Sequence, residues 1–244
     1  MPTPPYNPLC QHLSKSMVCL AGALLSSALL AQSPAPLVSP APSAQRELQA
    51  IQAAQSAYEN GQAGLAQRRF TTLAKQGNAW AMYNLAAMHM QGEAKPSSSV
   101  QAKFWLEKAA VQAYPQALYV LGQAYEGGQF EAKNLAKAAQ YYGLAAQAGS
   151  AAGRIEYATA LYLGRGIPMD LTEAGYWYLE AAKAGDKDTQ FMVARMFETG
   201  EGRPQDERMA RYWYAAAAKN GDLPSQAKLF AYEREDEKRR ASGQ

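Results

Sequence analysis

The pattern of apolar and polar positions after Gln45 contains no alternating stretch longer than a few residues. A half-buried strand would show such alternation, so the pattern argues against a sheet. The same part of the chain is rich in alanine, leucine and glutamine, which are strong helix formers. We therefore expect an all-α body.

The helical part repeats itself at intervals of 36 residues. Alanine pairs mark the interval, a bulky ring stands four positions before each pair, and a small residue stands four positions after its first alanine. These positions are Ala109-Ala110, Ala145-Ala146, Ala181-Ala182 and Ala217-Ala218; Trp105, Tyr141, Trp177 and Trp213; and Ala113, Gly149, Gly185 and Gly221, with Gly77 extending the glycine series backward. A second series at the same spacing contains Gly92, Gly128, Gly164 and Gly200. Repeats of this length predict stacked helix pairs.

Each 36-residue unit has the residues that two helices and two turns need. Glycine readily adopts the left-handed conformation that ends a helix, so both glycine series predict helix ends. The loops that begin at Gly164 and Gly200 end in Asp170 and Asp206, whose carboxylates can cap the next helix. Glu173 lies three residues after Asp170, a spacing that predicts a capping box.

The segments "LGQAYEGG" (121–128), "GRGIPMDLTEAGYWYLEAAKAGD" (164–186) and "GEGRPQDERMARYWYAAAAKNGD" (200–222) resemble the Sel-one-like repeat family, which is related to the tetratricopeptide repeat. The resemblance implies a right-handed α-solenoid of antiparallel helix pairs, with the first helix of each pair on the concave side. Four repeats are expected, at residues 78–113, 114–149, 150–185 and 186–221. The match is strongest in the last two repeats and weakest in the loop of the first.

The two ends of the array depart from the repeat. Residues 45–77 resemble a shorter, atypical first repeat. Residues 222–244 begin another first helix, which runs into the mixed-charge stretch EREDEKRR. A polar closing helix suits the end of an open solenoid, because its outer face has no neighbour.

The stretch Met17–Leu30 contains no charged residue, and Lys15 precedes it. This arrangement is typical of a secretory signal peptide, and the stretch is shorter than the roughly 20 apolar residues of a membrane span. We expect residues 1–31 to be a signal peptide, with cleavage near Ala31, and the mature protein to be periplasmic or secreted, without membrane insertion. A retained leader that anchors the chain is the alternative. Residues 32–44 follow as a proline-rich linker.

The composition excludes several kinds of chemistry. Both cysteines, Cys10 and Cys19, lie in the expected leader, so the mature fold cannot depend on disulfides. His89 is the only histidine outside the leader, which leaves no usual zinc ligand set and no Cys-His nucleophile. The chain has 24 basic and 21 acidic side chains and a formal net charge of +3. This balance gives no reason to expect nucleic acid as a partner.

Packing and capping explain the residues that could otherwise suggest a catalytic or metal site. The three tryptophans of the ring series stand beside the alanine pairs, and His89 occupies the register of Tyr125 in the next repeat. Asp186 and Asp188 suit the first turn of a helix, where carboxylates are favoured. Glu198 with Glu201 forms a second acidic pair at a helix end. We expect no catalytic, cofactor-binding or metal-binding residues.

The first helix of each repeat also has positions that fall between the packing positions. If these line the concave side, they offer aromatic anchors early in the array and mixed charge later, which suits a peptide or helix. Inter-repeat packing is the equally weighted alternative for the large apolar members. The candidates are Tyr83, Ala87 and Met90; Tyr119, Gln123 and Glu126; Ile155, Thr159 and Tyr162; and Phe191, Arg195 and Glu198.

These features predict an exported, non-enzymatic scaffold that binds a protein or peptide and needs no cofactor. The family resemblance implies roles in the assembly or regulation of envelope machinery. Two other functions stay open. One is a hydrolase of cell-wall or β-lactam substrates, and the other is an anchored structural subunit of a secretion or pilus assembly.

Overall fold

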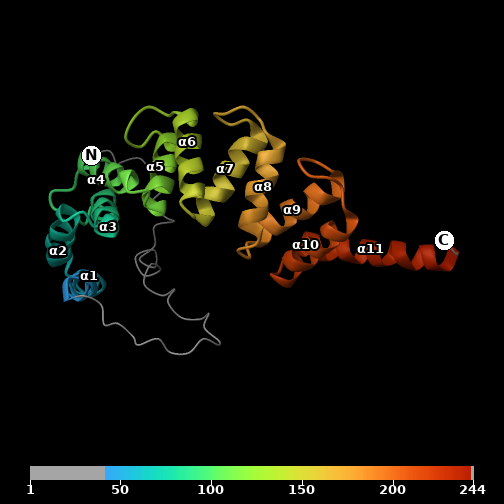
Figure 1. Ribbon diagram of the computed structural model, residues 1–244, viewed down its shortest axis with the longest axis horizontal. Helices are drawn as coiled ribbons and strands as arrows, with labels where there is room; N and C mark the ends of the chain where they lie inside the picture. Colours follow the sequence, from blue (N-terminus) through green and yellow to red (C-terminus); the bar gives the residue numbers. More distant parts are fainter. Residues whose placement is uncertain (1–41, 243–244) are drawn as a thin grey trace, which may run out of the picture. The chain divides into compact units, whose positions relative to one another are not determined.

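The computed structural model describes residues 42–242, and all regular structure in that range is helical (Figure 1). The helices are α1 (Pro42–Glu59), α2 (Ala63–Lys75), α3 (Ala79–Met90), α4 (Ser99–Val111), α5 (Pro115–Gly127), α6 (Leu135–Gln147), α7 (Ala151–Leu163), α8 (Leu171–Ala182), α9 (Lys187–Thr199), α10 (Glu207–Lys219) and α11 (Leu223–Ser242). They form consecutive packed pairs, so the expected α-solenoid is confirmed. The predicted signal peptide and most of the predicted linker lie outside the described residues.

The chain divides into two compact units, with the boundary between Trp105 and Leu106. In the first unit, α1 starts at Pro42, three residues before the expected start of the helical body. The α1–α2 pair then joins α3 through a chain of rings. The ring of Phe70 lies 6.3 Å from that of Tyr58 and 5.4 Å from that of Trp80, centroid to centroid.

In the second unit, α5 to α10 follow one another as first and second helices of successive repeats (Figure 1). The loop inside each repeat is closed by the same backbone hydrogen bond. The amides of Asn134, Asp170 and Asp206 donate to the carbonyls of Tyr125, Leu161 and Phe197 at 2.8, 3.0 and 2.9 Å, respectively. Because the bond recurs every 36 residues, each second helix starts at the same point relative to its first helix.

Side-chain caps fix the beginnings of these helices. Asp170 and Asp206 accept from backbone amides three residues later, as predicted, and Asp186 caps α9 in the same way. The expected capping box at Asp170 is not formed, because the Asp170 amide donates to the Leu161 carbonyl instead. Glu173 accepts hydrogen bonds from Trp177 and Tyr157 instead.

Left-handed residues end the helices, as the two glycine series predict. Positive φ angles occur at Gly77, Gly92, Gly128, Gly149, Gly164, Gly185, Gly200 and Gly221. Ala113, which stands in the glycine register of the first repeat, also has a positive φ of 54°. The register therefore imposes the turn even on a residue with a Cβ, at a conformational cost.

Packing between neighbouring helices depends on matched side-chain sizes. A Cβ on Gly122 would lie 2.5 Å from the ring of Tyr142, and a Cβ on Gly143 would lie 3.1 Å from the ring of Tyr157. Thirty-six residues later, the positions of Gly143 and Tyr157 hold Leu179 and Val193, which belong to the same apolar cluster. A small and a large side chain in one interface thus correspond to two medium ones in the next.

The tryptophans of the ring series contribute to packing to different degrees. Trp213 is 7% exposed and belongs to the core cluster of α7 to α10. Trp177 is partly buried, and its ring meets that of Tyr157 edge-on at 5.8 Å. Trp105 is also partly buried.

Helix α11 repeats the register of a first helix. Asp222 caps it by accepting from the Ser225 amide, and Ser225 is fully buried. Leu229 and Tyr232 pack on the core cluster. Phe230 occupies the register of Ala194, yet it is 61% exposed, because no described helix covers that side of α11.

Two glycines of the second unit allow the cost of a positive φ angle to be measured apart from the cost of a steric clash. Both Gly185 and Gly202 have positive φ, but a Cβ on Gly185 meets nothing within 4 Å, whereas one on Gly202 would lie 2.2 Å from the Leu171 carbonyl oxygen. We expect Gly185→Ala to lower the free energy of unfolding by about 1 kcal/mol. Gly202→Ala should cost about 1–3 kcal/mol more, because the loop must move off α8. Urea unfolding followed by circular dichroism tests this, and equal losses would contradict it.

Candidate functional site

The candidate residues of the first helices differ in how accessible they are. Tyr83 on α3 is 7% exposed and is part of the core. Arg195 on α9 is exposed. The other candidates are partly buried: Ala87, Met90, Tyr119, Gln123, Glu126, Ile155, Thr159, Tyr162, Phe191 and Glu198. We call the nine candidates on α5, α7 and α9 the first-helix row; they are Tyr119, Gln123, Glu126, Ile155, Thr159, Tyr162, Phe191, Arg195 and Glu198.

Tyrosines from the second helices reach the first-helix row at the repeat interval. Tyr142 donates to Glu126 at 2.7 Å, and Tyr214, two repeats later, donates to Glu198 at the same distance. In the repeat between them, the hydroxyl of Tyr178 lies 2.9 Å from that of Thr159. Glu126, Thr159 and Glu198 were among the sequence candidates but the three tyrosines were not, although the 36-residue spacing of these tyrosines was available as a signal.

Two carboxylates and one guanidinium meet between α5 and α7. Arg165, from the loop after α7, lies 3.0 Å from Glu126 and 3.3 Å from Glu156. Gln123 on α5 donates to the hydroxyl of Tyr119 at 3.0 Å. Glu156 and Arg165 were not among the sequence candidates, because neither falls at the positions from which the row was chosen.

The guanidinium of Arg165 does not fully offset the effect of burial on the carboxyl group of Glu156. Burial raises the pKa of Glu156, and the nearby charge of Glu126 raises it further, while Arg165 lowers it. The net shift of the Glu156 pKa is upward. Burial, with the carboxylate of Glu126, also raises the pKa of the Tyr142 hydroxyl, which keeps this group a hydrogen-bond donor.

Glu198 joins helix α11 to α9 and α10 through hydrogen bonds. Its carboxylate accepts from Tyr214 at 2.7 Å and from two residues of α11, Lys228 at 2.9 Å and Tyr232 at 3.1 Å. Burial favours the neutral form of Glu198, but these hydrogen bonds and the Lys228 charge outweigh it and lower the pKa. One residue of the row is therefore occupied by the chain's own C-terminal helix.

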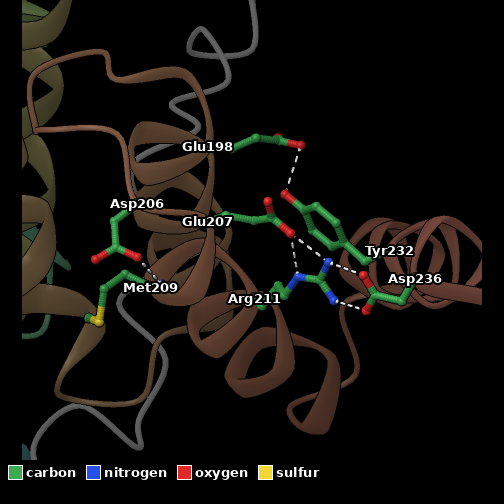
Figure 2. A network of polar contacts seen from close by, with 7 residues as sticks. All are labelled: Glu198, Asp206, Glu207, Met209, Arg211, Tyr232 and Asp236. Carbon is green, nitrogen blue, oxygen red and sulfur yellow. Dashed lines mark hydrogen bonds and ion pairs between the residues drawn. The ribbon is translucent and has the colours of Figure 1, made fainter. Parts of the chain in front are cut away.

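A second polar contact joins α10 to α11 (Figure 2). Arg211 makes two hydrogen bonds to Asp236, at 2.6 and 2.9 Å, and its Nε donates to Glu207 at 2.9 Å. The guanidinium also lies over the ring of Tyr232, 4.4 Å from its centroid. A planar fork between two carboxylates fixes the direction of α11 more closely than a single point charge would.

No group of three His, Cys, Asp or Glu side chains that could hold a metal ion occurs within residues 42–242. His89 is buried, and burial lowers the pKa of its imidazole, in keeping with a packing role. Over the same residues, no helix has both the length and the apolar character needed to cross a bilayer.

The Sel1 repeat family model matches residues 81–113, 115–150, 151–186 and 187–222. The chain belongs to the Sel1 repeat family. The matched Sel1 repeats begin one to three residues after the starts expected from the 36-residue register. No curated protein sequence matches the chain.

Two solved Sel1 repeat structures resemble this chain. A Sel1 repeat protein from Oxalobacter formigenes matches with a TM-score of 0.64 and 30% identity, over 68% of this chain and 49% of the other. A protective antigen of uropathogenic Escherichia coli strains, which displays the same repeat fold, matches with a TM-score of 0.62 and 30% identity, over 69% of this chain and 36% of the other. The chain thus spans less than half the length of each.

The raised pKa of Glu156 predicts the direction in which stability changes with pH. Because the folded state disfavours the carboxylate, ionised Glu156 reduces stability above its folded pKa, and this loss disappears as the pH falls through that pKa. We expect Glu156→Gln to raise the melting temperature at about pH 7, with a smaller gain toward about pH 4. The control is Glu180→Gln, which removes a surface ion pair with Lys183 and should change little. A lower melting temperature for Glu156→Gln at neutral pH would refute this account.

Glu198 should behave in the opposite way. Its lowered pKa means that the carboxylate contributes stability above the unfolded pKa and loses it as the pH falls through the folded one. Glu198→Gln should therefore lower the melting temperature at about pH 7, and the difference from the unaltered protein should fade toward about pH 3. Thermal unfolding at several pH values measures both effects, and a pH-independent difference would show that the ionised form is not what holds α11.

Proposed function

We propose that the protein is an exported scaffold that binds a segment of a partner protein along the first-helix row. Sel1 repeat proteins are generally protein-interaction scaffolds, and four Sel1 repeats make up most of the described chain. The chain offers no competing site with the residues of a metal centre within the part that the structure describes.

One observation carries the choice of the first-helix row. Its polar groups are held by tyrosines of the second helices, through hydrogen bonds that join Tyr142 with Glu126, Tyr178 with Thr159 and Tyr214 with Glu198. Side chains fixed in this way lose little conformational entropy when a partner binds. A row of partly exposed rings and fixed polar groups is what a preorganised peptide surface requires.

The charges of the row favour a partner segment with both signs of charge. Glu126 and Glu156 share the single guanidinium of Arg165, which leaves an excess of negative charge between α5 and α7. Farther along, Arg195 is exposed on α9, and no ion pair joins it to a described residue. A basic side chain beside Glu126 and Glu156 and an acidic one near Arg195 would complement this order.

Export is part of the proposal and rests on the uncharged stretch Met17–Leu30 that follows Lys15. The natural place for such a scaffold is the cell envelope, in the assembly or regulation of envelope proteins. Mass spectrometry of the amino terminus of the mature protein tests cleavage of the leader, and retention of residues 1–31 would favour the anchored alternative.

The partner site can be tested by photo-crosslinking in the native envelope. A photoreactive residue at Gln123 or Arg195 should capture the same partner, whereas one at Thr172 or Arg208, exposed on second helices, should not. With that partner purified, Arg195→Glu should weaken binding about tenfold or more, while the control Arg208→Glu changes it little. Capture from the two second-helix positions alone would place the partner on another face.

A further inference from the structure

We propose that the hollow between α6 and α7 is a second binding site, which takes one bulky apolar side chain from an extended segment of a partner protein. The site shares no residue with the first-helix row and does not depend on the function proposed for that row. Its occupant follows from the lining, the free polar groups at the rim, and the spacing between them.

The hollow has a volume of about 340 Å³ and an uncharged lining. Ala139, Gly143 and Leu144 of α6 contribute one wall, Tyr157 of α7 another, and Ile167 of the following loop the third. Leu144 is 48% exposed, so an apolar surface is open to solvent beside the hollow. An uncharged recess of this size, at the small end of ligand pockets, suits a single apolar anchor.

Two departures from the repeat distinguish the lining of the hollow from the corresponding place in the next repeat. Gly143 stands where the next two repeats have Leu179 and Ala215, and the ring of Tyr157 packs against it. Ile167 stands where the next repeat has Arg203, whose guanidinium lies over the ring of Phe197. The corresponding place in the next repeat therefore has a leucine at the glycine position and a charge in its loop.

Two glutamines at the rim indicate an extended occupant. Gln140 and Gln147 are exposed on the same side of α6, and neither side chain has a hydrogen-bond partner among residues 42–242. They lie seven residues apart, which is about 10.5 Å along a helix. Three residues of extended chain span about 10 Å. The two amides can thus pair with backbone groups on either side of a residue whose side chain enters the hollow.

The test uses a random peptide library displayed on phage and selected against the full chain. We expect the enriched peptides to share one bulky apolar residue and no required charge. Labelled synthetic copies then give dissociation constants by fluorescence anisotropy. No enrichment, or a consensus made of charged residues, would overturn the proposal.

Two variants locate the binding. Leu144→Glu places a charge at the edge of the hollow, at a position exposed enough to accept it. The paired change Gly143→Leu with Tyr157→Val copies Leu179 and Val193 from the next interface, and so reshapes the hollow with a combination that this chain already packs. Each should weaken the peptides at least tenfold while circular dichroism shows an intact helical fold.

Matched controls separate this site from others. Leu223→Glu alters an equally apolar side chain that is 72% exposed on α11, and it should leave peptide binding unchanged. Arg195→Glu, on the first-helix row, should also leave it unchanged. Peptides that bind Leu144→Glu and the paired variant as tightly as the unaltered protein, or that are lost in Arg195→Glu, would refute the site.

Discussion

Every helix pair in this protein depends on its neighbours to bury its apolar face. Alanine and glycine at fixed positions let helices approach closely, and rings from the adjoining helix fill the remaining space, as Tyr142 does against Gly122. The fit is so close that a single added carbon atom would collide with the ring. Because each interface is local, a change of size on one side can be absorbed on the other, as the pairing of Gly143 with Tyr157 illustrates.

Polar contacts have a different part in this arrangement. The recurring hydrogen bonds of the second-helix tyrosines join the two helices of a repeat. Their partners vary from repeat to repeat, with a carboxylate at Glu126 and Glu198 but a hydroxyl at Thr159. The tyrosines therefore recur at the repeat interval while the electrostatic character of the row changes along it. Specific recognition can evolve in such a row without disturbing the packing that supports it.

The 36-residue spacing of alanines, rings and glycines was enough to predict the helix pairs, their ends and the caps at Asp170 and Asp206. These features depend on local chemistry and on a register that the sequence repeats. The candidate site was less accessible to this reasoning. Tyr83 shares its register with Tyr119 but is buried, because burial depends on neighbouring helices that the register does not describe. Glu156 and Arg165 meet only because a loop folds back over the end of a helix. Glu173 accepts hydrogen bonds from side chains of two helices and does not bond the amide of the capping residue Asp170.

The exposed ring of Phe230 sets a limit on how this array could grow. In the other first helices, the equivalent position holds Ala86, Gly122, Ala158 or Ala194. At Gly122 even one added carbon atom would meet the partner ring at 2.5 Å. A further second helix at the usual distance from α11 would therefore collide with the phenyl group. Designed extension of the solenoid past this point would need a small residue at position 230 before any new repeat could stack.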